Sequence, residues 1–293
     1  MSSITEIKYN TPSQPRQLRL DTTTACNARC LSCHRFLTKR KGEMPSELIE
    51  QILNDVSRWH KPLEEIVPVN YGEFFLRKDW FDIMRLISRK LPNTEITLAT
   101  NGALVGQETV MKLCQIPQVR VINFSVDAYY DETYERFSGL PKETIPKIRQ
   151  AMAQIKILRP DIRLKVSMVF DPVYQTDLER DLFEWYWQGA VTWNPMLRKP
   201  DVWVIAAASA GRPDKKPVHP VALPCRSIFD AIVIGYDGKI SSCCFDAGFV
   251  IDLGYYKGNL LGSWHGPELT ELRKTHNEHR RGEIELCRKC TFA

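Results

Sequence analysis

Three cysteines near the start of the chain, Cys26, Cys30 and Cys33, have a spacing that could bring their thiolates to one point. Three residues separate the first pair and two separate the second, in a loop that follows a predicted strand. Thiolates are preferred ligands of iron–sulfur clusters, and three of them leave one iron of a four-iron cluster without a protein ligand. Such an open iron can bind a reactant. A loose zinc site or a disulfide cluster is the alternative for this spacing alone.

A second group of cysteines lies in the last third of the chain. Cys287 and Cys290 form a Cys-x2-Cys knuckle, and a predicted hairpin turn over residues 235–238 lies just before Cys243. Together with Cys225, these residues could converge as a site with four thiolates. Their spacing suits a zinc ribbon as well as it suits an iron–sulfur cluster.

Composition indicates a globular protein with room for one large domain and one small domain. Hydrophobic residues make up 43% and charged residues 26% of 293 positions. The sequence shows no signal peptide and no apolar run of membrane-spanning length, so we expect a cytoplasmic protein with no membrane partner. In that reducing compartment the nine cysteines are expected to bind metal. The net charge of +5 is spread along the chain, which argues against a nucleic-acid partner.

Strand and helix patterns alternate along the first two thirds of the chain. Strands are predicted over residues 17–23, 65–70, 95–99, 119–125 and 163–170, and helices from residue 46 and over 80–90, 107–114, 131–158 and 177–188. This alternation predicts parallel strands with right-handed crossovers. We therefore expect an α/β fold, a partial (β/α)6 TIM-like barrel.

The regular pattern ends in a proline-rich stretch over residues 192–224, which predicts a linker or a lid. We expect three parts: an N-terminal extension over 1–16, the barrel over 17–220, and a small domain over 221–293 that carries the second group of cysteines.

Polar residues follow the second, third and fourth predicted strands. In barrels of parallel strands the working residues lie on loops at the carboxyl ends of the strands. A glycine main chain followed by a carboxylate would suit an ammonium group, and hydroxyl, amide and carboxylate groups would suit a polar ligand. The candidates are Gly72, Glu73, Thr100, Asn101, Ser125 and Asp127.

These motifs, in this order, resemble those of the radical S-adenosylmethionine (radical SAM) family. The first three cysteines match the motif that binds a [4Fe–4S] cluster, whose open iron takes the amino and carboxylate groups of SAM. Tyr71-Gly72-Glu73-Phe74 is similar to the Gly-Gly-Glu-Pro segment of the family, with Tyr in place of the first Gly and Phe in place of Pro. The resemblance implies that Gly72 and Glu73 contact the SAM amino group. It implies that Thr100, Asn101, Ser125 and Asp127 hold the ribose or the methionyl carboxylate.

The C-terminal part is similar to the SPASM/twitch extension of radical SAM enzymes, in the layout of an aminocyclitol dehydrogenase. The segments that carry this similarity are Pro224-Cys225, residues 235–246, residues 257–260 and the terminal knuckle. The resemblance implies one auxiliary [4Fe–4S] cluster with four protein ligands, Cys225, Cys243, Cys287 and Cys290. Cys244 is left beside a ligand, where it could be an alternative ligand, an inert neighbour or a thiol hydrogen donor.

The resemblance implies an enzyme that takes an electron from a flavodoxin or ferredoxin and cleaves SAM to a 5′-deoxyadenosyl radical. We expect this radical to abstract hydrogen from a small, sugar-like or aminocyclitol-like substrate, with two-electron oxidation through the auxiliary cluster. One alternative is an epimerase with Cys244 as hydrogen donor. A second is a peptide (RiPP) maturase, although only about twenty residues precede the first strand. A third is a non-catalytic metal-binding module.

Overall fold

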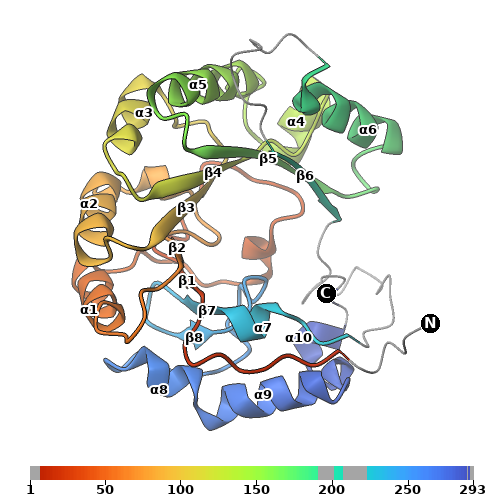
Figure 1. Ribbon diagram of the computed structural model, residues 1–293. Helices are drawn as coiled ribbons and strands as arrows, with labels where there is room; N and C mark the ends of the chain where they lie inside the picture. The colour runs from red at the N-terminus through yellow and green to blue at the C-terminus, as the bar shows by residue number, and fades with distance from the viewer. Residues whose placement is uncertain (1–6, 191–200, 207–222, 289, 291–293) are drawn as a thin grey trace.

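The computed structural model describes residues 7–190, 201–206, 223–288 and 290. Eight strands form one curved sheet in the order β6-β5-β4-β3-β2-β1-β7-β8 (Figure 1). The strands are β1 (Gln17–Leu20), β2 (Glu65–Val67), β3 (Glu95–Thr100), β4 (Val119–Ser125), β5 (Arg163–Phe170), β6 (Asp201–Ala206), β7 (Ala231–Ile234) and β8 (Ile240–Ser241). Among these eight described strands, only β8 is antiparallel to its neighbour.

Helices connect the strands, and α1, α2, α3 and α5 lie along one side of the curved sheet (Figure 1). The α-helices are α1 (Ser46–Val56), α2 (Trp80–Lys90), α3 (Gln107–Cys114), α4 (Asp131–Ser138), α5 (Thr144–Leu158), α6 (Asp177–Trp185), α7 (Ser227–Asp230), α8 (Leu260–Trp264), α9 (Pro267–Asn277) and α10 (Glu285–Arg288). Short helical turns are η2 (His34–Leu37), η3 (Phe74–Leu76), η4 (Tyr186–Ala190) and η5 (Arg281–Glu283). The predicted partial (β/α)6 barrel is confirmed by β1 to β6.

The strands place apolar residues on the helix side and polar or small residues on the inner side. Successive side chains of a strand point to opposite faces of the sheet. On β1, Leu18 and Leu20 are fully buried in the hydrophobic core, whereas Arg19 lines the cavity inside the sheet. On β4, Phe124 belongs to the core and Ser125 lines the same cavity. The alternation therefore builds a packed outer layer and a polar interior.

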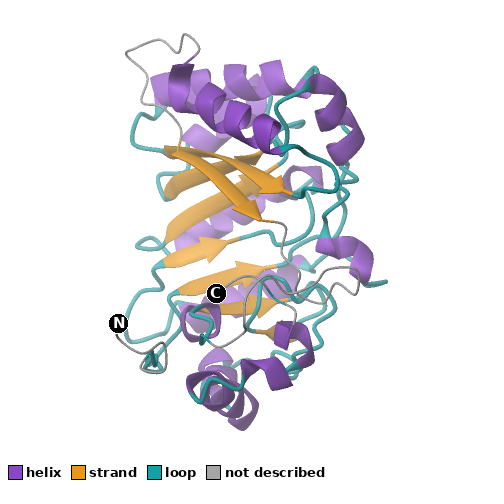
Figure 2. Cartoon of the chain, turned by 90° about the vertical axis from the view of Figure 1, so that its right-hand side faces the viewer, coloured by secondary structure: helices purple, strands orange, loops and turns teal. Residues whose placement is uncertain are grey.

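The C-terminal segment extends the sheet of the barrel. β7 pairs in parallel with β1, with Leu18 opposite Ile232, on the side of β1 away from β2. A hydrogen bond from the Leu260 main-chain N–H to Asp55 Oδ2, 2.7 Å long, joins the start of α8 to α1. The side view in Figure 2 shows the parallel strands pointing to one edge of the sheet. The second group of cysteines is thus tied to the barrel by main-chain pairing.

The predicted elements differ from the structure in several places. The first strand was predicted over 17–23 but ends at Leu20, and the third was predicted over 95–99 but ends at Thr100. The second strand was predicted over 65–70 but ends at Val67, because Pro68 has no N–H to donate to a neighbouring strand. The last predicted helix, 177–188, ends at Trp185 and continues as the π-turn η4. The irregular stretch predicted over 192–224 contains β6, so that prediction was wrong at residues 201–206.

The reason for β6 lies in its composition. Val202, Trp203, Val204 and Ile205 are β-branched or aromatic, and such residues favour strands despite the prolines on either side. β6 pairs in parallel with β5. The predicted domain boundary at residue 220 lies outside the described residues. Among the helices that the structure describes, none is long and apolar enough to cross a membrane.

Candidate active site and cysteine centres

The loop that carries the first three cysteines leaves β1 and is held by the end of α4. The main-chain N–H groups of Arg29 and Leu31 donate to the carbonyls of Ser138 and Phe137, at 2.7 and 2.9 Å. Gly139 ends α4 in the left-handed conformation, with φ of 67°. The loop is therefore fixed at its centre by a neighbouring helix, on either side of Cys30, the second cysteine of the set.

Cys26, Cys30 and Cys33 line one cavity of about 320 Å³ at the carboxyl ends of the strands. Burial is the main cause that raises the pKa of each thiol, and the Cys30 thiol is raised further by Asp127, Cys33 and Cys26. This mutual effect shows that the three thiols are neighbours. Three soft sulfur donors that line one cavity fit an iron–sulfur cluster.

Gly72 and Glu73 lie directly against this loop. A Cβ atom on Gly72 would lie 2.0 Å from the Thr23 carbonyl oxygen, so only glycine fits there. The Glu73 main-chain N–H donates to the Ala25 carbonyl at 2.8 Å. The predicted Gly-Glu pair therefore packs its main chain onto the residues that lead into Cys26.

The Glu73 carboxylate holds the loop after β3. Its Oε1 accepts a hydrogen bond from Thr100 Oγ1 at 3.0 Å, and its Oε2 accepts one from the Asn101 main-chain N–H at 2.8 Å. Burial raises the pKa of Glu73, while these donors and the Phe75 N–H act in the opposite direction. Two predicted motifs are thus joined through a buried carboxylate, and its role toward a SAM ammonium stays a prediction.

Asn101 connects the loop after β3 to the first cysteine. Its Nδ2 donates to Asn27 Oδ1 at 2.8 Å and lies 3.8 Å from Cys26 Sγ. Its Oδ1 accepts a hydrogen bond from the Ala103 N–H at 3.0 Å. The Asn101 side chain is therefore oriented by neighbours on both of its ends, and it lines the same cavity as the cysteines.

Ser125 and Asp127 bring the end of β4 to the cavity. Asp127 has φ of 65°, which is uncommon for a residue other than glycine. Its Oδ1 accepts a hydrogen bond from the Val169 N–H at 2.8 Å, and its carbonyl accepts one from Gln175. Burial raises the pKa of Asp127 to about 6, although the Val169 hydrogen bond acts against it. All the SAM-binding candidates, Gly72, Glu73, Thr100, Asn101, Ser125 and Asp127, line this one cavity.

Five cysteines of the C-terminal part line a second, much smaller pocket, here called the auxiliary site: the four predicted ligands Cys225, Cys243, Cys287 and Cys290, and Cys244. Burial raises the pKa of the Cys287 thiol to about 12, and Cys290 and Cys225 contribute to the rise. Burial also raises the pKa of the Cys243 thiol, and the neighbouring Cys244, Cys225 and Cys287 raise it further. Four soft donors around a buried pocket fit a fully ligated cluster, and a zinc ion would accept the same donors. Across the described part of the chain, no three His, Cys, Asp or Glu side chains are close enough to hold a single metal ion.

Cys244 and Phe245 form a wall that the two sites share, because both residues line the first cavity and the auxiliary pocket. The Phe245 ring contacts the ring of His34, with centroids 5.4 Å apart. The Phe245 main-chain N–H lies 3.4 Å from Cys243 Sγ. His34, which follows Cys33 of the first set, therefore contacts Phe245, which lies two positions after Cys243 of the auxiliary site.

Four functional candidates escaped the sequence reasoning. His276 and Arg281 line the auxiliary pocket, and both are almost completely buried. Asp246 accepts hydrogen bonds that shape the loop after Cys243, and Arg19 lines the first cavity. The sequence did contain a signal for Asp246, because it ends the Cys-Cys-Phe-Asp segment that resembles the SPASM/twitch extension. His276 and Arg281 gave no signal, because their neighbours are set by tertiary packing.

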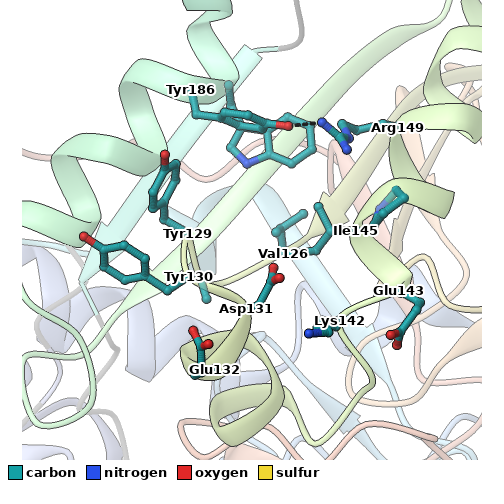
Figure 3. Close-up of a pocket in the computed structure, with 13 residues that line it drawn as sticks. Val126, Tyr129, Tyr130, Asp131, Glu132, Lys142, Glu143, Ile145, Arg149 and Tyr186 are labelled. Atoms are coloured by element: carbon teal, nitrogen blue, oxygen red, sulfur yellow. Dashed lines mark hydrogen bonds between the residues drawn. The ribbon is translucent and has the colours of Figure 1, made fainter. Parts of the chain in front are cut away.

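The larger pocket of about 580 Å³ lies elsewhere, between the loop after β4, the starts of α4 and α5, and η4 (Figure 3). Its wall includes Tyr129, Tyr186 and Arg149, and Arg149 donates a hydrogen bond to the Tyr186 hydroxyl. Val126 lines this pocket, while its neighbours Ser125 and Asp127 face the cysteine cavity. No predicted site residue lines it, so the chemistry is assigned to the cysteine cavity.

Comparison with solved structures supports the fold. BtrN in complex with AdoMet and 2-DOIA is 16% identical, with a TM-score of 0.64 over 97% of this chain and 94% of that chain. SuiB of Streptococcus suis bound to precursor peptide SuiA is 14% identical, with a TM-score of 0.66 over 96% of this chain and 71% of that chain. The protein anSMEcpe with bound AdoMet is 13% identical, with a TM-score of 0.66 over 94% and 88%.

Similar curated proteins match only part of the chain. A probable GTP 3',8-cyclase of Methanosarcina mazei is 29% identical over 137 residues, 45% of this chain and 39% of the relative. A probable GTP 3',8-cyclase of Thermoplasma volcanium is 31% identical over 125 residues, 42% of this chain and 36% of the relative. The match thus spans less than half the length of these curated relatives.

Family models match both parts of the chain. The radical SAM superfamily model matches residues 20–182, which is more than half of the chain. The SPASM model, an iron–sulfur cluster-binding domain, matches residues 225–291. These matches confirm the family prediction and its SAM and iron–sulfur cofactors. The chain belongs to the radical SAM superfamily and carries a SPASM domain.

Proposed function

We propose that this chain is a radical SAM oxidoreductase that cleaves SAM reductively and oxidises a small, sugar-like or aminocyclitol-like substrate by two electrons. Cys26, Cys30 and Cys33 would hold the SAM-binding [4Fe–4S] cluster. The auxiliary site would hold a second [4Fe–4S] cluster that accepts an electron. The observation that carries the proposal is the wall of Cys244 and Phe245, which puts both cysteine sites next to one cavity.

The residues that line the first cavity have different proposed roles. Gly72 keeps its segment packed on the first cysteine loop. Glu73 and Asp127, which line the cavity, are the candidate carboxylates for the ammonium and hydroxyl groups of SAM. When bound, SAM and its cluster supply a carbon-centred radical that removes hydrogen from an unactivated C–H bond. Ala99 and Val169 contribute apolar side chains to the cavity wall. Such side chains would limit the access of water to a radical.

The auxiliary site explains why oxidation is preferred. Four thiolates for four irons leave no iron free for a substrate, so the site suits electron transfer. A substrate that has lost a hydrogen atom reaches the two-electron oxidation level when it loses one more electron and a proton. A cluster held by the auxiliary cysteines would take this electron, and a base would take the proton. The electron that starts SAM cleavage would come from a flavodoxin or ferredoxin.

Other reactions have specific support. Cys244 lines the first cavity, where its thiol could return a hydrogen atom and give epimerisation. The curated relatives are named as cyclases of GTP, and SuiB was solved with a precursor peptide. A Cys244→Ala variant that turns over with unchanged stereochemistry would eliminate the epimerase. Incubation with 2-DOIA, GTP and a short peptide as probes would separate the remaining classes by which probe is consumed.

The proposal is tested by metal content and SAM cleavage in anaerobically prepared protein. Wild-type protein should contain about eight irons, and a variant with Cys26, Cys30 and Cys33 changed to Ala should keep about four. Wild-type protein with SAM and dithionite should form 5′-deoxyadenosine, and the variant should form none. About four irons with one zinc in the wild type, and no iron in the variant, would make the auxiliary site structural and overturn the oxidation mechanism.

A further inference from the structure

A buried histidine bridges two of the four cysteines of the auxiliary site. His276 lies on α9, is fully buried, and lines the auxiliary pocket. Its Nδ1 accepts a hydrogen bond from the Cys225 main-chain N–H at 3.1 Å. Its Nε2 lies 3.7 Å from Cys287 Sγ. Each ring nitrogen is thus directed at a different cysteine.

The contact with the Cys225 N–H fixes the tautomer of His276. A ring nitrogen that accepts a hydrogen bond carries no proton, so the proton of the neutral ring is on Nε2. Nε2–H therefore points at Cys287 Sγ and donates an N–H···S hydrogen bond. Hydrogen bonds to ligand sulfurs and the net charge of the site set the reduction potential of iron–sulfur clusters. A donor to sulfur favours the reduced state, which carries more negative charge.

Arg281 adds a positive charge on the same side. Its side chain is 2% exposed and lines the auxiliary pocket, and its Nη2 donates to the Cys290 carbonyl at 3.1 Å. In a buried setting a fixed cation stabilises added negative charge strongly. None of the described residues that line the auxiliary pocket is a carboxylate, although Asp246 lies near enough to raise the pKa of Cys287. The first cavity is lined by Glu73, Asp127 and Arg19, and Arg35 lies beside Cys33.

We propose that His276, supported by Arg281, raises the reduction potential of the auxiliary cluster. His276 is a positioning residue that acts through Cys287. A raised potential favours the auxiliary site as the destination for the electron that the substrate loses. This inference rests on the proposed function, since it requires a cluster at the auxiliary site.

The first test measures the potential of the auxiliary cluster without SAM and without substrate. The protein is the variant with Cys26, Cys30 and Cys33 changed to Ala, titrated with redox mediators and followed by electron paramagnetic resonance. Adding His276→Phe should lower the equilibrium constant for reduction about tenfold, which is about 59 mV for one electron. The matched control is His265→Phe, because His265 is exposed and contacts the Ser13 carbonyl at 2.8 Å. The control should leave the potential unchanged.

A second test needs no substitution at His276. In the same cysteine variant labelled with 15N-histidine, pulsed electron paramagnetic resonance should resolve one histidine nitrogen and one exchangeable proton coupled to the reduced cluster. Absence of both couplings overturns the inference, as does an unchanged potential in His276→Phe with full iron content. Either result leaves the proposed function standing. Zinc in place of iron at the auxiliary site would instead overturn both.

Discussion

The Tyr71 hydroxyl donates a hydrogen bond to the main-chain carbonyl of Cys244 at 2.5 Å. Asn70 Nδ2 donates to the same oxygen at 3.4 Å, and the Tyr71 main-chain N–H donates to Asp21 Oδ1 at 3.2 Å. Tyr71 occupies the position where the family segment has its first Gly. The departure from the family pattern therefore has a structural consequence, since the larger side chain joins the Gly-Glu segment to the loop of the auxiliary site.

Replacing Tyr71 by Phe should loosen this connection without emptying the cavity. The variant loses one partly buried hydrogen bond, so the free energy of unfolding should fall by about 1 kcal/mol. Alkylation of Cys244 by iodoacetamide, followed by mass spectrometry, should be several-fold faster than in wild-type protein. Tyr255→Phe is the control, because Tyr255 is 53% exposed. Equal alkylation rates in wild type and Tyr71→Phe would show that the hydrogen bond does not hold Cys244.

Gly72→Ala should disrupt the packing of the Gly-Glu segment on the first cysteine loop. The added Cβ would lie 2.0 Å from the Thr23 carbonyl oxygen and 2.9 Å from that of Ala25, both main-chain atoms that cannot rotate away. We expect a loss of roughly 3 kcal/mol in the free energy of unfolding, with weaker SAM binding. Gly106→Ala is the matched control, since nothing lies within 4 Å of its added Cβ. Denaturant unfolding and equilibrium dialysis with SAM measure the two effects. Similar values for both variants would show that the close packing at Gly72 does not require glycine.

Asp127→Asn should change how stability depends on pH. The folded-state pKa of Asp127, about 6, exceeds its ordinary value of 3.8, so the folded state binds the proton more tightly than the unfolded state. The contribution of Asp127 to the free energy of unfolding is therefore fully present below pH 3.8. It is lost as pH rises through 6, by roughly 3 kcal/mol in all. Asn accepts the Val169 hydrogen bond and tolerates positive φ, so the variant should escape this loss.

Denaturant unfolding of metal-free protein between pH 4.5 and 8 checks this expectation. The variant should gain stability relative to wild type as pH rises, and most of the gain should be present by pH 7. A constant difference across the range would mean that Asp127 titrates near its ordinary pKa. SAM binding should weaken in the same variant if the carboxylate contacts a hydroxyl or ammonium group of the ligand.

Prediction from sequence succeeded where a signal was local. The helices α2 and α3 and the strands β4 and β5 begin and end where hydrophobic periodicity placed them. The three cysteines and the six SAM-binding candidates that line the first cavity were found, because each motif follows a strand whose carboxyl end faces the same edge. Other lining residues, such as His34 and Asn70, were not predicted. The pairing of β7 with β1 was not predicted, since nothing in a four-residue apolar strand specifies its distant partner.

His276 shows the limit of sequence reasoning most clearly. It stands alone on a polar helix, eleven positions before Cys287, and no spacing rule links the two. Its role follows only from the packing of α9 against the segment that starts at Cys225. Tyr71 was noticed as a departure from the family pattern, but its partner Cys244 lies 173 positions away and could be found only from the structure.

Asp246→Asn should damage the auxiliary site while leaving the first site intact. The Asp246 carboxylate is buried, and it accepts hydrogen bonds from Ser241 Oγ and the Ile251 N–H through Oδ2 and from the Val250 N–H through Oδ1. These bonds fold the loop that presents Cys243. An amide can replace only one of the two oxygens as an acceptor, so its NH2 group would face donors.

Loss of such supporting contacts lowers metal affinity about tenfold or more. We therefore expect Asp246→Asn to lose iron from the auxiliary site during gel filtration and to keep SAM binding at the first cavity. The matched control is Asp252→Asn, whose exposed carboxylate accepts a hydrogen bond from the Gly254 N–H at 3.0 Å. Iron retention equal to wild type in Asp246→Asn would show that the loop holds Cys243 in place without this carboxylate, and that metal ligation itself organises the segment.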